Sequence, residues 1–189
     1  MEQASTTGAV YALLPICVVS DVSNLYDLIL KEKEKNMKDT FTECYNKNGF
    51  KELCKKFLDK NPRPSYTFIM IDLDDFKAIN DNFGHETGDK VLLETVKQLR
   101  EFFPRPSLIG RFGGDEFMVL CPFSQKELLE ETINHFMECT IPPYSVKKSV
   151  GYTFIPDDKI DYEEIIKTAD KALYTAKQKK NCAVFSSIF

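Results

Sequence analysis

The chain has 189 residues with ordinary apolar and charged fractions of 43% and 29%, so it can bury one sizeable core and fits one domain with an appendage. Its formal net charge of −4 gives no sign of a nucleic-acid-binding surface, and a polyanionic ligand would need cations to mediate its binding. The six cysteines, Cys17, Cys44, Cys54, Cys121, Cys139 and Cys182, show no metal-ligand pairing, and we expect them to be reduced, in a cytoplasmic protein.

The N-terminal region predicts a strand over Val10–Val19 and a helix over Asn24–Thr40, where apolar residues recur at helical spacing before a Lys/Glu run. The mainly apolar stretch Gly8–Ser20, which lies within the uncharged run Gln3–Ser20, is too short to cross a bilayer, so we expect no membrane segment in this chain. We expect residues 1–38 to be a strand and helix connector, with the tail of a truncated upstream sensory domain as one interpretation. Residues 39–189 would form the main domain.

The remaining pattern alternates between helices and strands, and a hairpin in its middle excludes a purely parallel sheet. We therefore predict an α+β fold of the ferredoxin-like β-α-β-β-α-β type, with a central mixed, mainly antiparallel five-stranded sheet flanked by helices and an N-terminal helical extension. The expected elements are a helix over Asn46–Leu58, a strand over Tyr66–Leu73, a helix over Asp75–Asn82, a loop over Phe83–Gly88, a helix over Asp89–Phe103, the hairpin, a helix over Gln125–Glu138, a strand over Tyr144–Phe154, a helix over Tyr162–Lys179 and a strand over Cys182–Phe185.

The hairpin is centred on Arg111–Phe117, where apolar runs flank Gly113-Gly114 and two acids follow. Tight primed turns need positive φ, which glycine adopts readily. A plain surface turn is the alternative interpretation. A second acidic cluster, Asp72–Asp75, ends the predicted Tyr66–Leu73 strand, and the two clusters together favour a functional site.

Asp72 is the most informative of these acids, because it still lies inside the strand and shares a face with Phe68 and Met70. Burying a carboxylate there is costly unless it is paired or binds a metal. Asp74 and Asp75 have a simpler explanation, since both can cap the helix that follows.

If this strand lies beside the hairpin, Asp72 meets Asp115 and Glu116, and three such carboxylates repel one another unless a divalent cation holds them. Magnesium fits, because it binds one or two carboxylates together with substrate phosphate oxygens. Such a site on a central sheet indicates phosphoryl or nucleotidyl transfer.

Five motifs together resemble the GGDEF domain, the diguanylate cyclase family, over about Asp39–Phe185. They are Asp72–Asp81, Phe83–His85 with Gly88-Asp89, Arg111–Phe117, Ser149–Tyr152 and Ala169–Lys177. The resemblance implies a nucleotidyl-cyclase palm and a signalling output module. Its reaction would condense two GTP into cyclic di-GMP and two pyrophosphates with Mg²⁺ or Mn²⁺.

The resemblance also implies roles at the acidic site. The Asp72 side chain and the Leu73 carbonyl would bind the metal together with Asp115 and Glu116. One of the hairpin acids, with Asp115 favoured, would help deprotonate the ribose 3′-hydroxyl. Lys77 would join these acids as a catalytic group facing the phosphates.

Five residues would contact the nucleotide: Asn80, His85, Asp89, Lys177 and Gly114. Lys177 would face phosphates, and Asn80 and Asp89 would read guanine. A carboxylate accepts hydrogen bonds from guanine N1–H and the 2-amine, which adenine lacks, so adenine would leave Asp89 unpaired at about 1–3 kcal/mol. Asp89 can instead cap its helix, Asn80 can sit in a turn, and His85 alone is more typical of a loop histidine.

The sequence departs from the family pattern at three places. Pro104 and Ser107 replace the Arg and Asp of the usual product-inhibition motif, so we expect no feedback binding of cyclic di-GMP there. Lys47 replaces an Arg and loses its bidentate geometry. The loop after Lys177 is one residue shorter than usual, which puts one phosphate contact in question.

Three hypotheses follow. The first is an active cyclase that works as a homodimer, because each site holds one GTP and two must face each other. The second is a catalytically weak or inactive domain that binds GTP as a regulatory or interaction module. The third is a cyclase for a different dinucleotide, against which the retained Asp89 argues.

Overall fold

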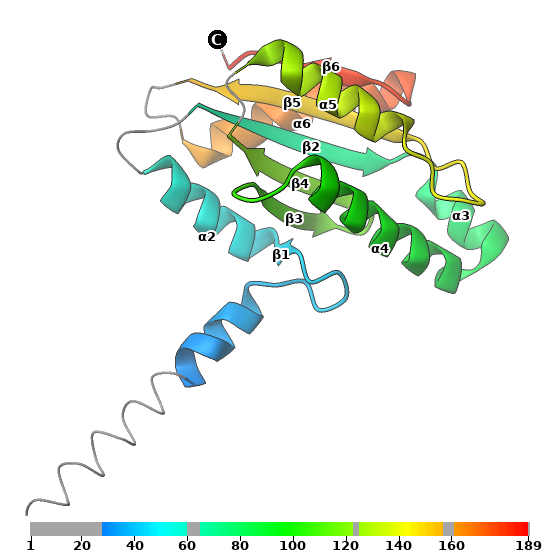
Figure 1. Ribbon diagram of the computed structural model, residues 1–189, viewed down its shortest axis with the longest axis horizontal. Coiled ribbons are helices and arrows are strands. Elements are labelled where there is room, and N and C mark those ends of the chain that lie inside the picture. The colour runs from blue at the N-terminus through cyan, green and yellow to red at the C-terminus, as the bar shows by residue number, and fades with distance from the viewer. Residues whose placement is uncertain (1–27, 60–64, 123–124, 157–160, 189) are drawn as a thin grey trace, which may run out of the picture. The chain divides into compact units, whose positions relative to one another are not determined.

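The computed structural model (Figure 1) describes residues 28–59, 65–122, 125–156 and 161–188. The chain divides into two units, Met1–Met37 and Lys38–Phe189. In the first unit, residues 28–36 are helical. The predicted strand Val10–Val19 and the start of the predicted helix Asn24–Thr40 lie outside the described residues.

The second unit is built on a mixed sheet with the strand order β1-β3-β4-β2-β5-β6 in the part of the chain that the structure describes. The pairs β3–β4, β4–β2 and β2–β5 are antiparallel, and the edge pairs β1–β3 and β5–β6 are parallel. The strands are β1 (Tyr45–Asn46), β2 (Tyr66–Leu73), β3 (Leu108–Gly113), β4 (Glu116–Cys121), β5 (Lys148–Ile155) and β6 (Ala183–Phe185).

The predicted α+β class and mainly antiparallel sheet are confirmed, but the sheet has six strands rather than five within the described residues. The additional strand is β1, which contains two residues. A strand of that length shows no alternation in the sequence, so only its pairing with β3 defines it.

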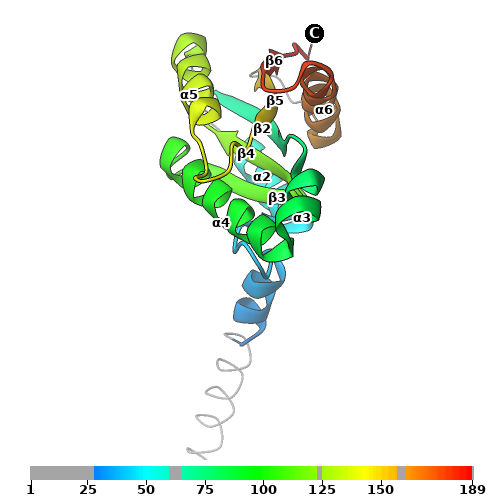
Figure 2. The ribbon, with the colours of Figure 1, turned by 90° about the vertical axis from the view of Figure 1, so that its right-hand side faces the viewer.

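Helices cover both faces of the sheet, as Figure 2 shows for α4 and α5 on one side and α6 on the other. One core cluster joins the sheet to α4 and α5, and the second joins it to α2 and α6. The helices are α2 (Lys47–Leu58), α3 (Phe76–Phe83), α4 (His85–Phe102), α5 (Lys126–Glu138) and α6 (Tyr162–Lys179).

The central strand β2 contributes to both core clusters, and all of its residues are buried, as predicted. Phe68 and Met70 point toward α2 and α6, whereas Ile69 and Ile71 point toward α4 and α5. This alternation places Asp72 at the end of the strand on the face covered by α6.

The predicted loop Phe83–Gly88 is wrong over most of its length, because α3 runs through Phe83 and α4 begins at His85. Gly84 alone separates the two helices, with a φ of +83° that favours glycine. The polar residues after Gly84 resemble a loop in sequence. Glu86 instead stabilises the first turn of α4 through the helix dipole.

Candidate active site

The three predicted carboxylates meet at one end of the sheet. Asp72 and Glu116 are directly opposite each other on the antiparallel strands β2 and β4. Asp115 lies in the turn before β4, and its carbonyl oxygen accepts a hydrogen bond of 3.4 Å from the Leu73 backbone N–H. The hairpin therefore lies beside the end of β2, as the sequence predicted.

Lys177, near the end of α6, brings a positive charge to these acids. Its Nζ lies 2.6 Å from Asp72 Oδ2 and 3.8 Å from Glu116 Oε1. Lys177 was predicted to face phosphates, and its direct contacts with the two carboxylates were not predicted. The pair is formed by helix packing, so nothing in the local sequence around either residue signals it.

One lysine does not compensate the buried negative charge. Burial raises the pKa of Asp72 above its ordinary value even though Lys177 opposes this, and Asp115 and Asp74 add to the rise. Burial likewise raises the pKa of Glu116. Burial alone would lower the pKa of Lys177, but its hydrogen bond to Asp72 and the Glu116 charge raise it. The site therefore favours a further cation.

The donor set fits a hard divalent ion. Carboxylate and carbonyl oxygens are the ligands that Mg²⁺ prefers. Within the described residues, no group of three or more His, Cys, Asp or Glu side chains is arranged to hold a metal. The chain would thus supply part of a coordination shell, and phosphate oxygens and water would complete it.

The capping predicted for Asp74 is wrong, and Asp75 does not cap α3 with its side chain either. Asp74 accepts hydrogen bonds from Ser149 Oγ at 2.7 Å and from the Asn181 backbone N–H at 2.8 Å. Asp75 occupies the N-cap position with a φ of +57° and makes no side-chain cap bond. An N-cap side chain reaches the first free N–H groups from an extended backbone, so this left-handed conformation explains the missing bond.

The carboxylate of Asp75 instead contacts Lys180 Nζ at 2.7 and 2.8 Å. Lys180 and Asn181 also have positive φ. The loop after β2 and the loop after α6 are therefore tied together beside the acids by the contacts of Asp74 and Asp75.

The hairpin turn is fixed by Arg111, which the sequence indicated only as part of a motif. Its Nε and Nη2 donate to the Gly114 carbonyl oxygen at 2.9 and 2.7 Å, and its Nη1 lies 3.2 Å from Asp39 Oδ1. Gly114 has a φ of +35°. The guanidinium closes the turn that presents Asp115.

Of the five predicted nucleotide contacts, Lys177 lies on α6 and Gly114 in the hairpin turn, and the other three lie on α3 and α4. Asn80 lies within α3, and Asp89 lies inside α4 beyond its first turn, so neither the turn nor the cap explanation applies to them. His85 is the first residue of α4 and is exposed, and Lys77 is exposed near the start of α3. The side chain of Asn80 lies against Gly88, the residue before Asp89.

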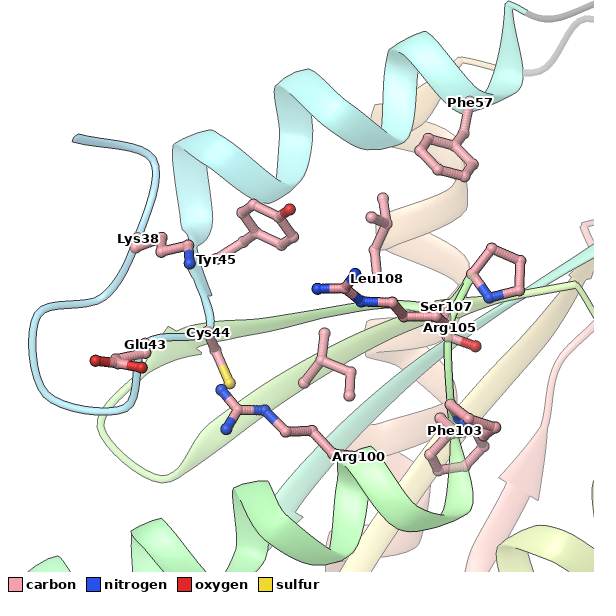
Figure 3. Close-up of a pocket in the computed structure, with 13 residues that line it drawn as sticks. Lys38, Glu43, Cys44, Tyr45, Phe57, Arg100, Phe103, Arg105, Ser107 and Leu108 are labelled. Atoms are coloured by element: carbon pink, nitrogen blue, oxygen red, sulfur yellow. The ribbon is translucent and has the colours of Figure 1, made fainter. Parts of the chain in front are cut away.

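A separate pocket of about 780 Å³ surrounds the segment that contains Pro104 and Ser107. Figure 3 shows the guanidinium groups of Arg100 and Arg105 among its lining side chains, with Tyr45 on the α2 side. None of the three carboxylates lines this pocket. It is therefore distinct from the acidic site.

A family model described as "Diguanylate cyclase, GGDEF domain" matches residues 36–182. Among curated proteins, the chain is 32% identical over 150 residues to the "Probable diguanylate cyclase DgcC" of Escherichia coli K12, covering 75% of this chain and 40% of that protein. It is 30% identical over 168 residues to "Diguanylate cyclase DgcP" of Pseudomonas aeruginosa, covering 84% and 25%. The chain thus spans less than half the length of these relatives.

A third relative has a different name. The chain is 29% identical over 147 residues to the "Cyclic di-GMP phosphodiesterase PdeR" of Escherichia coli K12, covering 74% of this chain and 22% of that protein.

Solved structures show the same fold. The coiled coil and GGDEF domain of DgcB from Caulobacter crescentus, in complex with c-di-GMP, has a TM-score of 0.80 at 19% identity, covering 94% of this chain and all of that one, 100%. Diguanylate cyclase SiaD from Pseudomonas aeruginosa, in complex with its activator SiaC, has a TM-score of 0.73 at 29% identity, covering 94% and 73%. Among the described residues, no helix is both long and apolar enough to span a membrane.

Proposed function

The chain belongs to the GGDEF family of diguanylate cyclases, and on that premise we propose that it condenses two molecules of GTP into cyclic di-GMP and two molecules of pyrophosphate. The observation that carries this proposal is the convergence of Asp72, Asp115 and Glu116 at one end of the sheet, with Lys177 between two of them.

These acids would hold the metal. The side chains of Asp72, Asp115 and Glu116 and the carbonyl of Leu73 would ligate Mg²⁺ or Mn²⁺, and because the described side chains are not arranged around one ion, the carboxylates would reorient on binding. When bound, the ion supplies charge that stabilises the attacking and leaving oxygens of a phosphoryl transfer. The raised pKa values of Asp72 and Glu116 support this role, because burial disfavours their ionised forms even with Lys177 present and a bound cation would offset that cost.

Each condensation step transfers one proton. The ribose 3′-oxygen of one GTP forms a bond to the α-phosphorus of the other, and the bond to pyrophosphate breaks. A hairpin carboxylate, with Asp115 favoured, accepts the hydroxyl proton. The ammonium of Lys177 has three donors, so it can keep its contact with Asp72 and still donate to a phosphate oxygen. Lys77 would donate to a phosphate oxygen from α3.

Guanine would be read from the two helices beside the acids. Asp89 would accept from N1–H and the 2-amine, and Asn80 would contact the same base edge. His85 and the Gly114 backbone would complete the nucleotide contacts. A base without these donors leaves Asp89 unpaired, at about 1–3 kcal/mol.

Two such domains are needed for one product. Each site accommodates one GTP, and each of the two attacks joins one nucleotide to the other. We therefore propose that the active species is a homodimer with its acidic sites facing each other, acting as a signalling output module.

The test is turnover by the intact chain. Incubation with GTP and Mg²⁺, followed by chromatography, should give cyclic di-GMP. Glu116→Gln and Asp72→Asn keep the side-chain shapes but remove negative charge, and each should lower kcat by at least about a hundredfold. Lys97→Gln, an exposed change on α4, is the matched control. A chain that binds GTP and never forms product would contradict the proposal.

A GTP-binding regulatory module without turnover is the second candidate. Two observations favour it: Lys177 contacts both Asp72 and Glu116 directly, and one relative is named a phosphodiesterase rather than a cyclase. In that case chromatography would return intact GTP from a chain that binds it. If the chain forms a mixed dinucleotide when ATP is offered with GTP, it is instead a cyclase that makes a product other than cyclic di-GMP.

A further inference from the structure

We infer that Gly88 is a specificity-determining position, because the lack of a side chain there leaves room for the amide of Asn80 against the residue that precedes Asp89. This inference rests on the proposed function, in which Asn80 and Asp89 read guanine. The glycine would then set guanine recognition without touching the nucleotide, as a positioning residue.

The close approach is visible between α3 and α4. A Cβ built at Gly88 would lie 1.9 Å from Asn80 Oδ1 and 2.9 Å from Asn80 Cγ. The next neighbour, Phe76 Cζ, would be 3.1 Å away. The Asn80 amide therefore occupies the space that any side chain at position 88 would need.

Backbone conformation does not explain this glycine. Gly88 lies inside α4 and is not among the described glycines with positive φ, which are Gly84 and Gly114. Glycine in the interior of a helix is destabilising relative to alanine. Its presence at a buried helical position therefore has a steric reason, and the structure supplies one in the Asn80 side chain.

Gly151 shows what a glycine required for packing looks like. A Cβ at Gly151 would lie 2.1 Å from the Leu173 backbone nitrogen and 2.5 Å from the Ala169 carbonyl oxygen. Those atoms belong to the backbone of α6 and cannot move without the helix. At Gly88 the obstructed atoms are the end of a polar side chain, which can rotate away while the helices stay in place.

Gly88→Ala should therefore keep the fold and displace the amide. Asn80 is held on α3, which follows directly from the loop carrying Asp74 and Asp75, and Asp89 is the residue after Gly88. Moving the Asn80 amide away from its place against Gly88 should weaken guanine binding. The acids of β2 and the hairpin keep their positions, so KM for GTP should rise while kcat changes little.

A double-mutant cycle on the intact chain tests this. Wild type, Gly88→Ala, Asn80→Ala and the double variant are titrated with a GTP analogue whose α–β bridging oxygen is a methylene group, in Mg²⁺, by calorimetry. Gly88→Ala and Asn80→Ala should each weaken binding about tenfold, the size of one lost hydrogen bond. The double variant should bind no more weakly than Asn80→Ala alone. Glu101→Ala, an exposed change on α4, should bind like wild type.

Base discrimination and thermal unfolding are measured in parallel. The preference for the GTP analogue over its ATP counterpart should fall in Gly88→Ala as it does in Asn80→Ala. The unfolding temperature should stay close to that of wild type. If Gly88→Ala unfolds, the double variant should refold, because it removes the side chain that clashes.

Several outcomes would overturn the inference. Normal binding by Gly88→Ala beside a weakened Asn80→Ala would show that the glycine does not position the amide. If Gly88→Ala weakens binding equally in the wild-type chain and in the Asn80→Ala chain, or unfolds both, the glycine has a packing role instead. If Asn80→Ala binds normally while wild type still makes product, the inference fails and the cyclase survives. If wild type neither binds nor converts GTP, the proposed function fails.

Discussion

Lys177 places its single positive charge between two carboxylates from different strands. At the scale of individual residues, this contact decides how the acidic site behaves. Asp72 is 5% exposed, and its pKa is raised by burial even with the lysine present. The lysine therefore holds together a site whose acids would otherwise repel one another.

Removing that charge should weaken nucleotide binding. In Lys177→Gln, Asp72 loses its ammonium partner, and the phosphates lose a donor. We expect KM for GTP to rise at least about tenfold, since hydrogen bonds to charged groups contribute about 1.5–3 kcal/mol. Steady-state kinetics measures this, with the exposed Lys171→Gln on the same helix as control. An unchanged KM would show that Lys177 does not contact the nucleotide.

A second residue-scale prediction concerns Lys148, which is 0% exposed. Its Nζ donates to the carbonyl oxygens of Phe136 and Cys139 at 3.1 and 2.6 Å, at the end of α5. Burial lowers its pKa from 10.5 to about 8. Between about pH 8 and pH 10 the unfolded chain therefore binds a proton that the folded chain does not.

The free energy of unfolding should accordingly rise with pH through that window, by at most about 1.4 kcal/mol per pH unit from this group. Below the window, Lys148 should contribute no pH dependence. Lys148→Met should lose this rise. At pH 7 it should be less stable by about 1–3 kcal/mol, because both carbonyls lose their donor. Urea unfolding of both proteins at several pH values measures the difference. Parallel pH profiles would contradict the assignment.

At the scale of elements, helix α6 is held to β5 through Gly151. The backbone of α6 lies where any side chain at this position would project. The same helix carries Lys177 to Asp72. Packing on the sheet and the geometry of the acidic site are therefore linked through one helix.

Gly151→Ala should displace α6. We expect it to lower the free energy of unfolding by about 1–3 kcal/mol, the usual cost of overpacking, and to reduce activity per folded molecule by moving Lys177. Urea denaturation and kinetics at matched folded concentration measure these effects. Thr175→Ala, exposed on α6, should change neither. Wild-type stability in Gly151→Ala would show that α6 can shift without cost.

At the scale of the whole molecule, the proposed reaction needs two chains. If the active species is a homodimer, specific activity should rise with protein concentration and level off where the dimer saturates. Assays over a dilution series, with ultracentrifugation at the same concentrations, measure this. Constant specific activity at concentrations where the chain is monomeric would exclude the dimer mechanism.

A second whole-molecule prediction concerns product control. Pro104 and Ser107 offer neither a forked cation nor a carboxylate, although Arg100 and Arg105 line the pocket around them. We expect no binding of cyclic di-GMP at this pocket in calorimetry and no product inhibition through it. If cyclic di-GMP binds the chain, Arg105→Ala shows where, because Arg105 lines this pocket and not the acidic site. Binding of cyclic di-GMP that this substitution abolishes would contradict the prediction.

The sequence by itself determined most of the long elements and the acidic residues that meet at the end of the sheet. Local periodicity, glycine placement and residue type predicted the burial of β2, the bounds of α6, the hairpin and the three acids. These signals are carried by residues that are neighbours along the chain. Tertiary structure alone decided the contacts of Lys177 with Asp72, of Asp74 with Ser149 and Asn181, and of Asn80 with Gly88. It also decided the two-residue strand β1. These features join residues that are distant in sequence or too few to form a pattern, so they exist only once the helices have packed on the sheet.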